Sequence, residues 1–207
     1  QQVSSAASDV YKRQIDILDV GHGLSLILEK NNHVVVYDLG NAWPGGSMVE
    51  SLLIPTLSQR GIDEIQGVII SHFDSDHAGG YPALLENYQP EWIRASQSLN
   101  HKMSSVVQAC TLGEAWEWQN VQFEVLWPPQ LVNRAYNPHS CVIRIIEPES
   151  GFSMLLTGDI ELVSEWLLAR EGEQLQSDVM LVPHHGSDTS SITPVSYTHL
   201  TLPTTPV

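Results

Sequence analysis

The sequence predicts a mixed α/β domain in which two sheets carry helices on their outer faces. Short runs rich in Val, Ile and Leu alternate with Gly, Asn and Asp, as expected for strands separated by turns. Helix-like stretches occur among these runs without strict strand-helix alternation, and hairpin signals indicate antiparallel pairing. A chain of 207 residues with 42% hydrophobic content suits one domain with a sizeable core.

The elements follow from these patterns in order. Asn31 and Asn32 tolerate positive φ and join two runs into an opening hairpin. Pro55 should lie early in the first helix or kink it. The predicted strands are Ile15–Val20, Ser25–Glu29, His33–Tyr37, Gly67–Ser71, Gln122–Trp127, Cys141–Ile146, Ser153–Thr157 and Val179–Pro183. The predicted helices are about Met48–Arg60, Ala78–Asn87 and Ile160–Arg170.

The two ends of the chain differ from its middle. Residues 1–14 and 195–207 are polar, lack a sustained apolar period and resemble translated adapter or linker sequence. We therefore expect one domain over residues 15–194, cut off soon after Ser191, with a C-terminal piece missing. No run approaches the roughly 18 apolar residues that a membrane helix needs, and the start lacks a signal-peptide pattern. This segment is expected to be soluble by itself.

Charge and cysteine content restrict the function. A net charge of -15 argues against a surface that holds nucleic acid by broad phosphate neutralisation, so an anionic substrate needs a local site. Carboxylates that bind divalent cations would account for part of the acidity. The two cysteines, Cys110 and Cys141, are either two buried small hydrophobic residues or a single disulfide.

A dense group of metal-ligand side chains follows a continuous apolar run. His72, Asp74, Asp76 and His77 lie within six residues, and Gly79-Gly80 then lets the chain turn sharply into a helix. Imidazole nitrogen and carboxylate oxygen suit zinc, manganese or iron. The spacing predicts His72 with Asp74 on one ion and Asp76 with His77 on a second. An ordinary solvated turn would rarely hold this set.

Two later strand ends have the same form. Asp159 lies at a strand-to-helix junction, where a carboxylate is suited to bridge two cations or to cap a helix. His184 and His185 follow another strand and are ligands or surface residues. We expect three strand ends to converge on one edge. His139 has intermediate support as a ligand. The remaining histidines, predicted to be surface or packing residues, are His22, His33, His101 and His199.

The run from His72 to His77 resembles the signature of the metallo-β-lactamase superfamily, in the variant where Asp replaces the second His. Further segments are similar to the C-terminal domain of ComEC-type DNA-internalisation proteins, particularly the proteobacterial branch. The resemblance covers nearly everything from Ile15 to Ser191. These segments are Leu18–Ser25, Val36–Gly40, Gly113–Trp118, His139–Val142, Leu155–Glu161 and Val182–Ser191.

The resemblance implies a four-layer αββα sandwich, truncated at its C-terminus, that acts as a binuclear metal-dependent nuclease with two zinc or manganese ions. Catalysis would rest on Asp76, which orients the nucleophile, on bridging Asp159 and on His72. Asn137, Ser187 or a non-ligating His139 would contact substrate or support a ligand. The implied ligands are His72, Asp74, Asp76, His77, Asp159 and one of His184 and His185, with His139 as an additional candidate.

The resemblance also implies a setting. The domain would accompany a membrane channel and an oligonucleotide-binding-fold domain, outside the inner membrane in the periplasm, and degrade one DNA strand while the other enters. It also suggests a Cys110–Cys141 disulfide. Two alternatives remain: a hydrolase of a lactone, thioester, lactam or phosphocholine ester, and a non-catalytic, metal-stabilised docking domain. Trp116-Glu117-Trp118 would stack on bases or pack in the core.

Overall fold

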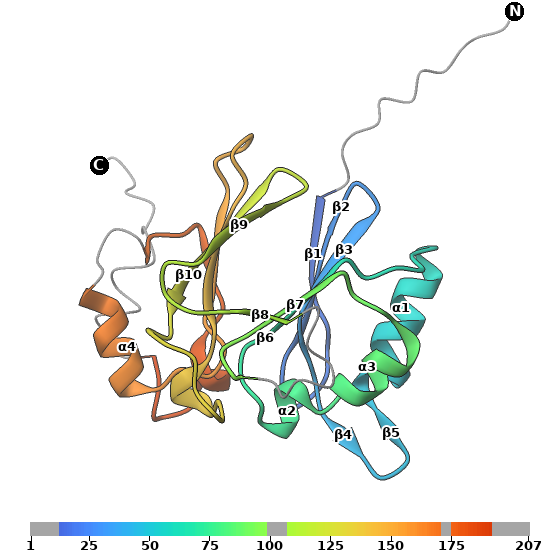
Figure 1. Cartoon of the computed structure of the whole chain (residues 1–207), viewed down its shortest axis with the longest axis horizontal. Helices are drawn as coiled ribbons and strands as arrows, with labels where there is room; N and C mark the ends of the chain where they lie inside the picture. Colours follow the sequence, from blue (N-terminus) through green and yellow to red (C-terminus); the bar gives the residue numbers. More distant parts are fainter. Residues whose placement is uncertain (1–12, 99–106, 171–174, 192–207) are drawn as a thin grey trace, which may run out of the picture.

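The computed structural model describes residues 13–98, 107–170 and 175–191, and shows two sheets packed face to face with helices on both outer sides (Figure 1). The predicted tails lie outside the described residues, except for Arg13 and Gln14, which pair with β2. His101 and His199 also lie outside the described residues. None of the described helices is long and apolar enough to cross a membrane.

The first sheet has six strands in the order β1-β2-β3-β6-β7-β8. The pairs β1/β2 and β2/β3 are antiparallel, and the pairs from β3 to β8 are parallel. Positive φ at Asn31 and Asn32 confirms the predicted hairpin turn. The strands are β1 (Arg13–Ile17), β2 (Ser25–Lys30), β3 (His33–Leu39), β6 (Gly67–Ile70), β7 (Trp92–Ala95) and β8 (Val107–Ala109).

The second sheet has five strands in the order β13-β12-β11-β10-β9. All of its pairs are antiparallel except β12/β13, which is parallel. A small separate hairpin is formed by β4 (Ala42–Trp43) and β5 (Gly46–Ser47). The strands are β9 (Ala115–Trp118), β10 (Val121–Trp127), β11 (Val142–Ile146), β12 (Ser153–Leu156) and β13 (Val179–Met180).

The helices cover the outer faces of the two sheets (Figure 1). The π-helical turn η1 (Val49–Leu53), α1 (Ile54–Gln59) and α3 (Tyr81–Asn87) bury side chains against the first sheet. Helix α4 (Leu162–Leu168) packs on the second sheet through Leu168, beside Leu155 and Ile160. The expected four-layer αββα sandwich is therefore confirmed.

Three expected helices differ in detail from the structure. The first is divided between η1 and α1, and Pro55 lies in the first turn of α1, as predicted. The second is broken at Gly79-Gly80 into α2 (Ser75–Ala78) and α3. The third starts two residues later than expected, after its N-cap residue Glu161.

Strands β4, β5, β7, β8 and β9 were not predicted, and the last predicted strand is shorter than expected. Strand β13 ends at Met180, and Pro183–Gly186 forms the 3₁₀ turn η5 instead. Pro183 has no N–H to donate to the ladder, so the strand cannot continue through it. Trp116 stacks on Phe123 with ring centroids 4.9 Å apart, so the packing alternative holds for this aromatic segment.

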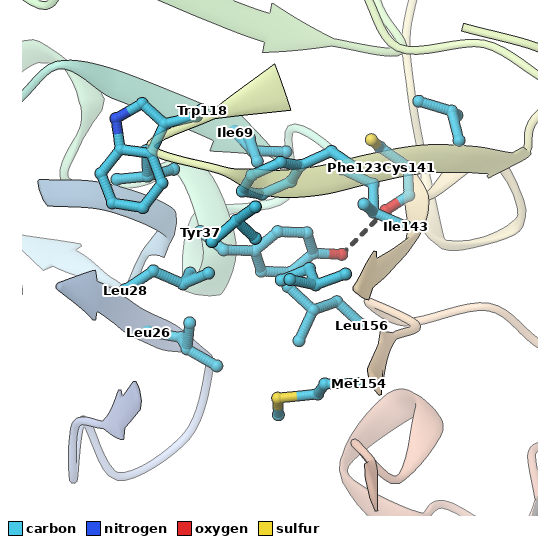
Figure 2. Packing of buried hydrophobic residues seen from close by; sticks show 14 of the residues in the cluster. Leu26, Leu28, Tyr37, Ile69, Trp118, Phe123, Cys141, Ile143, Met154 and Leu156 are labelled. Carbon is cyan, nitrogen blue, oxygen red and sulfur yellow. Dashed lines mark hydrogen bonds between the residues drawn. The ribbon is translucent and has the colours of Figure 1, made fainter. Parts of the chain in front are cut away.

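The central core lies between the two sheets (Figure 2). Tyr37 of β3 is fully buried, and its hydroxyl donates a hydrogen bond of 2.8 Å to the carbonyl oxygen of Cys141. Cys141 also forms a disulfide with Cys110, which confirms the pairing suggested by the resemblance. Both cysteines are fully buried. The Tyr37 hydrogen bond and the disulfide therefore both join the two halves of the sandwich at Cys141.

Replacing Tyr37 by Phe should lower the free energy of unfolding by about 1–3 kcal/mol, because the variant leaves a buried carbonyl without its donor. Urea unfolding measures the change. Tyr136, which is exposed, provides the matched control, and Tyr136→Phe should change stability by less than about 0.5 kcal/mol. Equal stability of the Tyr37→Phe variant and the parent would show that the bond contributes nothing net.

Candidate metal centre

His72 is a buried imidazole whose two nitrogens have different surroundings. Nδ1 lies 2.9 Å from the hydroxyl of Ser71 and 3.4 Å from that of Ser140. Nε2 is buried and has no hydrogen-bond partner among the described residues; the nearest carboxylate oxygen, on Asp74, is 3.7 Å away. The Ser71 hydroxyl donates to Asp38, so it accepts from Nδ1–H and leaves the Nε2 lone pair free.

Asp38, near the end of β3, lies at the same site, although it was not among the predicted site residues. Its fully buried carboxylate accepts hydrogen bonds of 2.7 Å from the backbone N–H and from the hydroxyl of Ser71. Its Oδ2 also lies 2.7 Å from Nδ1 of His77. This contact directs Nε2 of His77 away from Asp38 and fixes the ring, as carboxylates do for metal-binding histidines.

Three other side chains converge in front of Nε2 of His77. Asp76, His77, Asp159 and His185 each offer one ligand atom, and these atoms lie within 4.8 Å of one another. Nε2 of His77 is 3.1 Å from Oδ1 of Asp159 and 3.3 Å from Nε2 of His185. Nε2 of His185 is 3.2 Å from Asp159 and 3.4 Å from Asp76. We call these four residues the His/Asp cluster.

The three predicted strand ends do meet at this edge. His72 follows β6, Asp159 follows β12, and His185 follows β13, so both sheets contribute. Gly158 makes the approach possible: it has φ of +53°, and a Cβ there would lie 2.8 Å from Cβ of Ser140. Asp159 does not cap α4, because the N-cap is Glu161; its carboxylate faces the histidines instead.

The structure separates the two adjacent histidines. His185 lies in the His/Asp cluster, whereas Nδ1 of His184 is 3.3 Å from Glu161 and 3.2 Å from the hydroxyl of Thr189. Asn137 lies beside His184, with its side-chain nitrogen 3.3 Å from Nε2 of that ring. Ser187 contacts Thr189 through its hydroxyl. Asn137 and Ser187 therefore lie in the surroundings of His184 and not in the cluster.

His139 and Asp74 also lie outside the four-residue group. His139 ends the 3₁₀ turn η3 (Asn137–His139), where its Nδ1 is 3.4 Å from the backbone nitrogen of Tyr136. That contact uses one ring nitrogen locally. Asp74 is one-third exposed and lies beside His72. The assignment of His72 with Asp74 to one ion and of Asp76 with His77 to a second stays a prediction.

His22 reaches the cluster, although it was expected to be a surface or packing residue. Its ring is exposed, yet Nε2 lies 3.4 Å from Asp76 and the ring centroid is 4.9 Å from that of His185. The loop that carries it is held by the N–H of Leu24, which donates to the carbonyl oxygen of Asp76. Gly23 permits this approach, since a Cβ there would overlap the same carbonyl. The glycines flanking His22 were the available signal.

The charges in the cluster are strongly coupled. Burial lowers the pKa of His72, so this ring is neutral near pH 7. Burial opposes protonation of His77 as well, but the carboxylates of Asp38 and Asp159 outweigh it and raise the pKa of His77 to about 10. The pKa of Asp159 is lowered because His77 outweighs the opposing effect of burial.

These residues fit divalent cations. The donors are imidazole nitrogens and carboxylate oxygens, which suit zinc and manganese, and Nε2 of His72 is a buried donor atom without a partner. In the metal-free protein the protonated imidazole of His77 supplies a positive charge beside the carboxylates. A bound cation would supply positive charge in place of that proton.

Comparison with known proteins identifies relatives of the whole described domain. A family model described as the metallo-beta-lactamase superfamily matches residues 18–197. YcaI of Escherichia coli (strain K12) is 41% identical over 183 residues, which cover 88% of this chain and 23% of that protein. Recombination protein 2 of Haemophilus influenzae is 41% identical over 178 residues (86% and 22%), and competence protein ComA of Neisseria gonorrhoeae is 29% identical over 185 residues (86% and 24%). The chain thus spans less than a quarter of these relatives.

Solved structures with the same fold are more distant in sequence. A metallo-β-lactamase of Cronobacter sakazakii with a HARLDQ motif superimposes with a TM-score of 0.57 at 14% identity, covering 76% of this chain and 70% of that one. MEM-A1, a subclass B3 metallo-β-lactamase from a soil metagenome library, gives 0.58 at 14% identity, covering 86% and 78%. Identities this low support a shared fold and no shared substrate.

The raised pKa of His77 predicts how the stability of the metal-free protein depends on pH. The folded-state pKa, about 10, lies above the ordinary 6.5. The stabilising contribution is therefore complete below pH 6.5 and is lost as pH rises toward 10. Urea unfolding with a chelator should give a lower free energy of unfolding at about pH 9.5 than at about pH 7.

Asp38→Asn is the matched variant for this measurement, because it removes a carboxylate that holds the proton on His77. The decrease in unfolding free energy with pH should be smaller in the variant than in the parent. Identical pH dependence in the two proteins would show that the Asp38–His77 pair is not its source.

Proposed function

Because the chain belongs to the metallo-β-lactamase superfamily, we propose that it is a binuclear metal-dependent phosphodiesterase, a nuclease that degrades one strand of DNA during uptake. The observation that carries the proposal is the His/Asp cluster, in which carboxylates and imidazoles from both sheets face one centre. Names among the relatives, a competence protein and a recombination protein, favour DNA over other substrates of the superfamily.

The residues divide into two ligand groups. His72 and Asp74 would hold one ion, and Asp76, His77 and His185 the other, with Asp159 between them. When bound, such ions lower the pKa of a water molecule and stabilise charge on phosphoryl oxygens. His139 and His184 are the weaker ligand candidates, since their ring nitrogens have local partners.

The chain's own side chains orient the reactants. Asp76 has its carboxylate at the open rim of the cluster, between His22, His77 and His185, so it is placed to accept a proton from an attacking water. Asp38 acts as a positioning residue through Nδ1 of His77. The Ser140 hydroxyl accepts a hydrogen bond from the backbone N–H of Asp159 and so helps to position this residue.

The proposed setting extends beyond this chain. We place the domain outside the inner membrane, in the periplasm, where it would accompany a membrane channel and an oligonucleotide-binding-fold domain. The relatives are more than four times as long as the matched segment, which leaves room for such domains. The disulfide between Cys110 and Cys141 suits an oxidising compartment.

The two-ion proposal predicts the metal content. After removal of metal and reloading with manganese or zinc, elemental analysis should give two ions per chain, and His72→Ala should keep about one, because the other ligand group stays complete. His33→Ala, at the start of β3, should keep both. One ion in the parent protein would contradict the two-ion site.

Asp76→Ala should reduce metal-dependent cleavage of single-stranded DNA at least about 100-fold, because it removes both a ligand and the proposed proton acceptor. Gel analysis of a labelled oligonucleotide measures the loss, and the exposed Asp63→Ala is the matched control. A lactam and a lactone are tested beside DNA. Cleavage of either in preference to DNA would favour another hydrolase, whereas DNA binding without any cleavage would favour a docking domain.

A further inference from the structure

A groove opens beside the candidate metal centre, and Asp74 is the proposed ligand that lines it. It has a volume of about 620 Å³, which is within the range of pockets that hold small organic ligands. Its walls come from the loop after His72, from α2, from the start of α3 and from the loop before η3. Its lining includes Phe73, Asp74, Tyr81 and Arg134.

Arg134 is fixed close to the metal-binding loop by the backbone of its neighbour. The N–H of Phe73 donates to the carbonyl oxygen of Ala135 at 3.1 Å. The N–H of Ala135 donates to the side-chain oxygen of Gln97 at 2.9 Å, and Ala135 is fully buried. The guanidinium carbon of Arg134 lies 4.6 Å from the ring centroid of Tyr136, which limits its movement.

Arg134 also differs in its partners from four of the other described basic side chains. Lys30, Arg60, Arg94 and Arg144 each form an ion pair with a glutamate or aspartate. Arg134 has no carboxylate partner among the described residues. In a chain with a net charge of -15, an unpaired guanidinium at the edge of this groove is suited to an anionic group of a ligand.

Part of the groove lining is aromatic. The rings of Phe73 and Tyr81 meet edge to face with centroids 6.2 Å apart, and both are partly buried. The hydroxyl of Tyr81 is a buried group without a hydrogen-bond partner among the described residues. The groove therefore offers an apolar surface and a cation beside Asp74.

We propose that this groove binds the nucleotide next to the scissile phosphate of single-stranded DNA. Arg134 contacts the neighbouring phosphate, and the base or sugar lies against Phe73 and Tyr81. A base that enters the groove must leave its stack, which favours a single strand over a duplex. The inference rests on the proposed nuclease function, and it assigns to that site the recognition of a second phosphate.

The test compares two phosphodiesters with the manganese-loaded chain. A labelled oligodeoxynucleotide carries a flanking nucleotide, whereas bis(4-nitrophenyl) phosphate has only the reacting phosphate. Arg134→Gln should lower kcat/KM for the oligonucleotide about 10-fold to 100-fold, chiefly through KM. Its effect on the small diester should stay within about twofold. Arg170→Gln removes an exposed arginine at the end of α4 and should change neither.

Equal losses on both substrates would overturn the inference, because Arg134 would then act on the reacting phosphate. An unchanged kcat/KM for the oligonucleotide would overturn it as well. A second measurement separates binding from cleavage. In the Asp76→Ala background, fluorescence anisotropy should show a dissociation constant for the oligonucleotide about 10-fold higher when Arg134 is replaced. If the parent cleaves neither diester but the dissociation constant rises, the nuclease function is wrong and nucleotide binding in the groove is supported. An unchanged dissociation constant contradicts nucleotide binding in the groove.

Discussion

The buried carboxylate of Asp38 is the constraint on which the candidate site depends. A fully buried charge is costly unless its hydrogen bonds are satisfied, and here the partners are the N–H and hydroxyl of Ser71 and the ring of His77. These bonds tie the end of β3 to the segment that follows the neighbouring strand β6. The carboxylate therefore fixes the first metal-binding loop and the tautomer of its histidine at the same time.

The rest of the site depends on how the two sheets are held together. His72 and His77 come from the first sheet, and Asp159 and His185 come from segments that follow the second. A small shift between the sheets would separate these ligands. Tyr37 and the disulfide of Cys141 resist such a shift near the cluster, and the buried ion pair between Lys30 and Glu147 links the sheets elsewhere. The geometry of the site is thus a property of the whole sandwich.

The sequence predicted those parts of the site that are local. The dense run from His72 to His77 after an apolar strand and the turn at Asn31-Asn32 need no knowledge of distant contacts. Strand β7 was missed because the charge of Arg94 argues against a buried strand, whereas its guanidinium packs 3.9 Å from the ring of Trp116. The contact that explains the buried Arg94 is distant in the sequence. Asp38 and His22 were missed because their partners are also far away in the sequence. The choice between His184 and His185 likewise depends on backbone angles that pattern does not reveal.

The balance of charge explains how so acidic a protein could act on phosphate. Asp38, Asp74, Asp76 and Asp159 place four carboxylates at the site, and a proton on His77 offsets only one of them. In the metal-free protein the site therefore repels anions. Two divalent ions would bring four positive charges and displace that proton. These charges would balance the four carboxylates, and the ions would face the groove. Metal binding would then create the attraction for the reacting phosphate, and an unpaired arginine at the rim would hold the next one.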